Sequence, residues 1–136
     1  MCGIIAYAGP QPGLDVVLSG LKRMEYRGYD SAGVAIVSEG SIASAKKAGK
    51  LANLETELQT HPLPAGQTVI GHTRWATHGP PTDQNAHPHV DPTNRFAVIH
   101  NGIIENFADL RAKLETHGVE FKSETDTEVV VHLVAE

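Results

Sequence analysis

The sequence predicts an α+β fold in which helices and strands follow one another in mixed order. Short apolar runs typical of strands alternate irregularly with segments of helical periodicity. Two of these runs are separated only by Glu39-Gly40, which indicates a hairpin and therefore antiparallel strands. No internal repeat or low-complexity tract is present. Together these observations argue against a parallel, doubly wound sheet.

Each element of the first half has its own signal. Beyond the breakers Gly9 and Pro10, apolar residues recur at helical spacing and predict an amphipathic helix. The run Val34–Val37 is continuously apolar, as in a strand covered on both faces. Regularly spaced leucines then mark a second, shorter helix. The expected elements are a strand at 2–8, a helix at 13–25, a hairpin of strands at 32–38 and 41–48, and a helix at 51–58.

In the second half, strands are expected at 68–72 and 96–100, separated by a long polar stretch of a kind that often carries function. A helix follows from Asn106 to Gly118. Thr125 with Glu128 forms a capping box, which predicts the start of a last helix. That helix is apolar on more than one side, so we expect burial on several faces and a domain that continues beyond residue 136.

Composition excludes several classes of protein. With 136 residues and 40% apolar content, the chain has the size of one globular domain or a large piece of one. A single cysteine excludes a disulfide framework and fits a cytoplasmic location. No apolar run is long enough for a signal peptide or membrane span. The net charge of −5 includes no basic stripe, which argues against nucleic-acid binding. Lys46, Lys47 and Lys50 are expected to form a solvated strand edge.

The single thiol stands at position 2, where a chain end would normally leave it exposed. Methionine before a small residue is commonly removed, so Cys2 becomes the first residue of the mature chain. Its α-amino group has an ordinary pKa of about 8 and can accept the thiol proton. An N-terminal nucleophile with its own amine as base is a known catalytic arrangement. The alternative is a small side chain in a first strand.

A nucleophile that attacks an amide carbon requires hydrogen-bond donors for the developing oxyanion. Asn101 supplies a side-chain N–H at the end of an apolar strand, and Gly102 allows a backbone N–H to approach a ligand closely. An ordinary Asn-Gly hairpin turn is the alternative interpretation.

Charged residues in the polar segments fit an amino-acid substrate. Arg74 follows a buried strand and could bind a carboxylate, while Asp126, expected in the first turn of the last helix and held there by its N-terminal amides, could bind an ammonium group. A surface ion pair is the alternative for each. Trp75 is either a core residue or a lid. Although eight histidines are present, no metal-site spacing or phosphate loop occurs, so no metal or cofactor is expected.

Six motifs occur in an order that closely resembles the glutaminase domain of the glutamine:fructose-6-phosphate aminotransferases, a family of class II glutamine amidotransferases and N-terminal-nucleophile hydrolases. The resemblance covers essentially the whole chain. It implies a four-layer αββα sandwich, of which residues 1–136 supply roughly the first half, cut inside a helix, with the sugar-phosphate isomerase region absent. The motifs are MCGII (1–5), YRGYDSAG (26–33), HTRWATHG (72–79), NAHPH (85–89), HNGIIEN (100–106) and SETDTE (123–128).

The resemblance also implies roles for the residues of these motifs. Cys2 matches the nucleophile that forms a γ-glutamyl thioester and releases ammonia. Asn101 and Gly102 match the oxyanion hole. The main chain of Arg27 and Gly28 matches the segment that orients the terminal amine.

Glutamine itself would be held by other residues. Arg74 and Asp126 match the groups that bind its α-carboxylate and α-amino group. Trp75 matches the residue that gates ammonia passage toward the partner region. The remaining matched positions line the pocket or its side, without an assigned role for the last: Thr77, His78 and His87.

The sequence therefore predicts glutamine hydrolysis that supplies ammonia for the conversion of fructose 6-phosphate to glucosamine 6-phosphate, in a homodimeric full-length protein. Two alternatives remain open. One is the glutaminase half of another class II amidotransferase, such as an amidophosphoribosyltransferase. The other is a non-catalytic module that binds glutamine.

Overall fold

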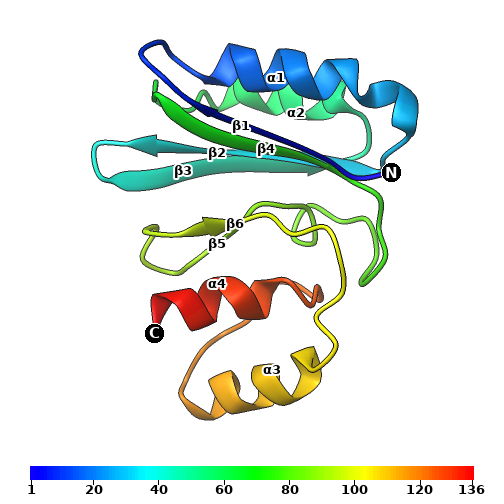
Figure 1. Ribbon diagram of the computed structural model, residues 1–136, viewed down its shortest axis with the longest axis vertical. Helices are drawn as coiled ribbons and strands as arrows, with labels where there is room; N and C mark the ends of the chain where they lie inside the picture. Colours follow the sequence, from blue (N-terminus) through cyan, green and yellow to red (C-terminus); the bar gives the residue numbers. More distant parts are fainter.

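A computed structural model describes residues 1–136 (Figure 1). Helices α1 and α2 lie on one face of a four-stranded sheet, and the small β5–β6 ladder, α4 and α3 lie beyond the opposite face. None of the helices has the length and apolar character needed to cross a membrane. The elements are β1 (Gly3–Ala8), α1 (Leu14–Arg23), a 3₁₀ turn (Glu25–Arg27), β2 (Ser31–Ser38), β3 (Ser41–Ala48), α2 (Leu51–Thr60), β4 (Thr68–Arg74), β5 (His89–Val90), β6 (Ala97–Val98), α3 (Phe107–Thr116) and α4 (Glu128–Ala135).

The four-stranded sheet is antiparallel, with the order β1-β4-β2-β3. Its β2–β3 hairpin confirms the predicted one, and Ser38 pairs with Ser41 directly beside the turn. The two turn residues, Glu39 and Gly40, both have positive φ, at 49° and 76°. Two-residue hairpin turns of this kind match the twist of the strands they join. The mixed helix and strand content agrees with the predicted α+β class.

Alternation along β4 separates the hydrophobic core from the polar side of the sheet. Val69 faces α1 and is 1% exposed. Gly71 faces the same way, and a Cβ there would lie 2.4 Å from Cγ1 of Val17, so only glycine lets α1 approach this closely. His72 and Arg74 therefore point to the opposite face. The main core on the helical side comprises Val17, Leu21, Tyr29, Ala32, Val34, Ile36, Leu51, Leu54 and Val69.

The polar segment before β5 packs directly onto that opposite face. A Cβ on Gly33 of β2 would lie only 2.0 Å from the carbonyl oxygen of His87, so the missing side chain makes room for this segment. Lys46 of β3 also contributes, because its Nζ donates to the carbonyls of Gln84 and Ala86, both at 2.9 Å. The prediction that Lys46 is a solvated edge residue is therefore wrong.

The C-terminal elements differ from the prediction in two places. The strand expected at 96–100 is reduced to the two residues of β6. The last helix begins at Glu128, and no side chain caps its first turn. The expected capping box is absent because the Glu128 carboxylate accepts hydrogen bonds from the backbone N–H groups of Lys122 at 2.8 Å and Ser123 at 2.7 Å.

Helix α4 is only partly enclosed. Val129 and Val131 are fully buried, which agrees with the expected apolar packing. Leu133 and Val134 are 38% and 52% exposed, so burial on several faces is not achieved within residues 1–136.

Candidate active site

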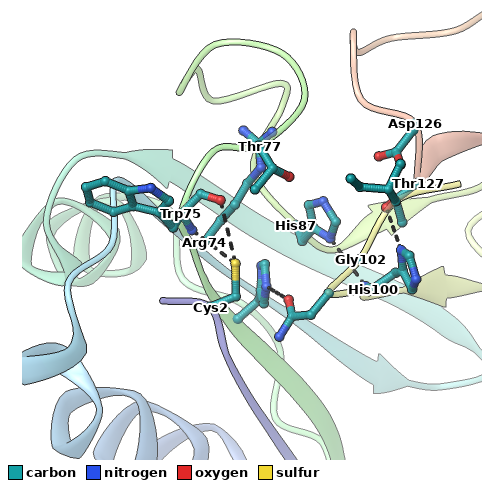
Figure 2. A pocket seen from close by; sticks show the side chains of 12 residues that line it. Cys2, Arg74, Trp75, Thr77, His87, His100, Gly102, Asp126 and Thr127 are labelled. Carbon is teal, nitrogen blue, oxygen red and sulfur yellow. Dashed lines mark hydrogen bonds between the residues drawn. The ribbon is translucent and has the colours of Figure 1, made fainter. Parts of the chain in front are cut away.

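A pocket of about 260 Å³ opens on the polar face of the sheet, at the end where β1 starts and β4 finishes. Figure 2 shows that its side chains converge from segments far apart in the sequence. Eight of the eleven predicted site residues line it: Cys2, Arg74, Trp75, Thr77, His87, Asn101, Gly102 and Asp126.

Cys2 immediately precedes β1, whose pairing with β4 ends at Gly3 opposite Thr73. One step further along the same register, Cys2 comes opposite Arg74. Its free, partly buried thiol is bracketed by the main chain of Trp75, as Figure 2 shows. The Trp75 N–H donates to Sγ at 3.2 Å, and Sγ lies 3.6 Å from the Trp75 carbonyl oxygen. A nucleophile held by backbone contacts of this kind has a fixed direction of approach.

The residues predicted to orient the terminal amine lie outside the pocket wall. The α-ammonium group of Met1 donates to the carbonyl oxygens of Arg27, at 3.0 Å, and Gly28, at 2.6 Å. The predicted contact with a terminal amine therefore exists, but for the residue before the thiol. Removal of Met1 would make the α-amine of Cys2 the terminal amine of the chain.

Asn101 and Gly102 lie in the loop between β6 and α3, where no hairpin forms. The alternative of an Asn-Gly hairpin turn is therefore wrong. A Cβ at Gly102 would come within 2.9 Å of the His100 ring, so glycine allows the loop to pass closely beside that imidazole. The Asn101 side-chain Oδ1 is 2.7 Å from Nε2 of His72, while its Nδ2 makes no hydrogen bond within the chain.

Arg74 lines the pocket and is only 4% exposed. Its guanidinium donates to three carbonyls of the following loop: those of Pro80 and Gly79, each at 3.4 Å, and that of His78. Burial lowers the pKa of Arg74, but a guanidinium keeps its charge in proteins. Because a guanidinium carries five N–H donors, donors remain for a ligand in the pocket.

Asp126 closes the opposite side of the pocket from a position just before α4, not from the first turn of that helix. Its Oδ2 accepts from the backbone N–H of Ile104 at 2.6 Å, so the amides of its own helix do not hold it as predicted. Its Oδ1 has no partner within the chain. His78 lies outside the pocket lining because its Nδ1–H donates to the Glu124 carbonyl at 3.0 Å and its ring packs edge-on against Phe107.

Three imidazoles form a buried column, of which His72 and His87 line the pocket and His89 lies beyond it. The ring centroids of His72 and His87 are 4.7 Å apart, as are those of His87 and His89. Burial lowers the pKa of all three, to about 4, about 2 and about 3 respectively, so each is neutral at pH 7. Neighbouring rings are tilted by 35° and 57°, and no group of three or more His, Cys, Asp or Glu side chains is arranged to hold a metal ion.

Four residues of the pocket lining were not predicted: His72, His100, Ile103 and Thr127. One of them had a usable signal in the sequence. His72 and Arg74 are two residues apart in a strand, so their side chains must share one face. The other three lie in loops, and hydrophobic periodicity in a sequence does not predict the path of a loop.

The domain family described as "Glutamine amidotransferase domain" matches residues 59–136 of the chain. Among characterised relatives, "Glutamine--fructose-6-phosphate aminotransferase [isomerizing]" from Streptomyces coelicolor is 69% identical over 136 residues, covering 100% of this chain. The protein of the same name from Leifsonia xyli is 62% identical over 135 residues, covering 98% of this chain. In both cases the chain spans only 22% of the relative's length.

Two solved structures are similar to this chain over its whole length. The structure titled "allosteric regulatory enzyme of purine biosynthesis" superposes with a TM-score of 0.81 at 26% identity, covering 100% of this chain and 30% of the other. Glutamine phosphoribosylpyrophosphate amidotransferase from B. subtilis gives 0.78 at 26% identity, covering 100% and 29%. From its family match and the mixed α/β architecture it shares with these structures, the chain belongs to the glutamine amidotransferase family.

Proposed function

We propose that this chain is roughly the first half of the glutaminase domain of a glutamine:fructose-6-phosphate aminotransferase, and that this domain hydrolyses the side-chain amide of glutamine through a thioester on Cys2. The single observation that carries the proposal is the pocket itself. It joins the chain's only thiol to two candidate oxyanion donors, Asn101 and Gly102, and to the opposite charges of Arg74 and Asp126.

The chemistry follows from the order of bond changes. After removal of Met1, the α-amine of Cys2 takes the thiol proton, and Sγ attacks the side-chain carbonyl carbon of glutamine. The resulting oxyanion is stabilised by N–H donors of Asn101 and Gly102. The amine returns the proton to the leaving nitrogen, the C–N bond breaks, and ammonia departs. Water then attacks the thioester, releasing glutamate and restoring the thiol.

Arg74 and Asp126 supply specificity for an α-amino acid. Arg74 has N–H donors left for the α-carboxylate, and the free Oδ1 of Asp126 can accept from the α-ammonium. Both side chains are almost fully buried, at 4% and 3% exposure, which strengthens such contacts relative to exposed ones.

Two exposed residues of the pocket lining, Trp75 and Ile103, are placed where ammonia could leave the pocket toward a further region of a longer protein. Trp75 and Ile103 line the pocket, yet they are 54% and 69% exposed. We assign Trp75 as the gate through which ammonia passes to a sugar-phosphate isomerase region, where fructose 6-phosphate becomes glucosamine 6-phosphate. In Figure 1, helices α1 and α2, the large sheet, the β5–β6 ladder and helices α4 and α3 lie one after another, which supports an αββα sandwich to which residues 1–136 contribute roughly the first half.

We assign the acceptor of the ammonia from the sequence identity of this chain to its relatives. The aminotransferase of S. coelicolor is 69% identical over the chain, whereas the purine-pathway structures are 26% identical. A phosphoribosyl acceptor is therefore the less favoured alternative, and a non-catalytic module would not require the thiol in the pocket.

The test uses the full-length protein with glutamine and either fructose 6-phosphate or phosphoribosyl pyrophosphate, following glutamate and amino product. We expect glutamate release with amino-sugar formation only in the presence of fructose 6-phosphate. Cys2→Ala should lose glutamate release while retaining glutamine binding by calorimetry. A Cys2→Ala protein that still releases glutamate would exclude the thioester route.

Intact mass spectrometry provides an independent control. The active protein should lack Met1, and an electrophilic glutamine analogue, 6-diazo-5-oxonorleucine, should label Cys2 alone. An active protein that retains Met1 would contradict the proposed base.

A further inference from the structure

His72 lies on β4, one of the two inner strands of the four-stranded sheet, and on the same face as Arg74. It is 1% exposed, yet its ring forms part of the pocket lining beside Cys2 and Asn101. Each ring nitrogen of a buried imidazole is expected to have a hydrogen-bond partner. One nitrogen has a partner and the other has none.

The partnered nitrogen is Nε2, which lies 2.7 Å from Oδ1 of Asn101. An amide oxygen only accepts, so Nε2 must carry the hydrogen. Nδ1 of His72 is buried without any hydrogen-bond partner. Neutral imidazole with the proton on Nε2 is the form that fits both observations, because a proton on Nδ1 would be an unsatisfied buried donor.

We propose that His72 is a positioning residue, whose Nε2–H holds Oδ1 of Asn101 and so turns the amide NH₂ toward the oxyanion that forms on the substrate. This inference rests on the proposed glutaminase function. His72 touches neither the nucleophile nor the substrate in this scheme, and it acts through Asn101.

The orientation matters because the two ends of an amide have opposite polarity. With Nε2 as donor, the Asn101 oxygen is occupied and the NH₂ group is left free. With the proton on Nδ1, Nε2 would be an acceptor and would attract the NH₂ group instead. The amide oxygen would then face the pocket and repel a developing negative charge. The tautomer of His72 thus decides whether Asn101 stabilises or opposes the oxyanion.

The surroundings of the ring favour its neutral state. The backbone N–H of His100 donates to Nδ1 of His87 at 3.4 Å, as Figure 2 shows, and the His87 ring packs against that of His72 at an angle of 35°. Burial lowers the pKa of His72 to about 4, so the ring stays neutral through the physiological range. The nearby charge of Arg74 acts in the same direction.

A matched pair of variants in the full-length protein tests the contribution of the N–H donor at the Nε2 position of His72. His72→Gln keeps an N–H donor near the Nε2 position, whereas His72→Met fills similar space without one. Both lose the ring and its packing against His87. We expect kcat for glutamate release to fall about ten- to a hundredfold further in the Met variant than in the Gln variant, with similar KM.

Asn101→Ala provides the background control. If His72 acts through Asn101, the difference between Gln and Met should disappear when Asn101 is alanine. Equal activity of the two His72 variants, or a difference that persists with Asn101→Ala, would overturn the inference. A wild-type protein that releases no glutamate would instead overturn the proposed function.

One measurement needs no substitution. In ¹⁵N-histidine-labelled protein, long-range ¹H–¹⁵N spectra should show His72 protonated at Nε2 and bare at Nδ1 at pH 7. Observation of the Nδ1–H form would exclude donation to Asn101, even if glutamine hydrolysis were normal.

Discussion

Lowering the pH from 7 to 5 should decrease the free energy of unfolding of this protein, because of the histidine column formed by His72, His87 and His89. Burial holds their pKa values near 4, 2 and 3, against an ordinary value of about 6.5 for an unfolded chain. At pH 5 all three are neutral when folded and charged when unfolded. The unfolded chain therefore binds more protons, and stability must fall as the pH drops below about 6.5.

The magnitude follows from linkage. Each histidine contributes about 1.4 kcal/mol per pH unit between its two pKa values. From pH 7 to pH 5 this amounts to about 2 kcal/mol for each residue and ~6 kcal/mol for the three residues of the column, against a typical domain stability of about 5–15 kcal/mol. The rings are at most 4% exposed, so solvent screens little of the effect. Lys46 and Arg74 reinforce the lowered pKa of His89, while Glu128 opposes it.

Hydrogen exchange measured by mass spectrometry reports this loss locally in the full-length protein. Protection of β4 amides, corrected for the intrinsic pH dependence of exchange, should decrease steeply between pH 7 and pH 5. His89→Gln removes one titrating ring outside the pocket and should reduce the slope by about 1.4 kcal/mol per pH unit. Protection that is unchanged or higher at pH 5 would refute the reasoning.

Three substitutions test other parts of the structure. Gly33→Ala places a methyl group 2.0 Å from the His87 carbonyl and should cost about 3 kcal/mol or more, measured as a lowered Tm or as aggregation; normal stability would mean that this segment packs elsewhere. Tyr29→Phe removes the hydroxyl that accepts from the Leu51 N–H at 2.6 Å, and should cost about 1–3 kcal/mol in denaturant unfolding without altering KM. Asp126→Asn should raise KM for glutamine about tenfold or more with a smaller change in kcat; an unchanged KM would remove Asp126 from substrate binding.

Much of the fold could be predicted because its signals are local. The helical periodicity of residues 13–25 and the turn at Glu39-Gly40 each lie within one short window, and the structure has a helix at 14–23 and a hairpin at that turn. Motif order placed Cys2, Asn101 and Asp126 among the site candidates, and the structure brings all three to one pocket. Their chemical roles stay predictions until the substitutions above are measured.

What the sequence by itself determined was the set of elements and the residue types available for chemistry, since both depend on neighbours a few positions apart. Tertiary structure alone decided which groups meet. The Glu128 carboxylate accepts from the Lys122 and Ser123 amides, so no capping box formed. Lys46 became partly buried because its Nζ reaches carbonyls about 40 residues away. The contact from His72 to Asn101 spans 29 residues and depends on the packing of a loop against a strand. Such contacts are selected by shape and by the cost of burying unpaired polar groups, which no local pattern records.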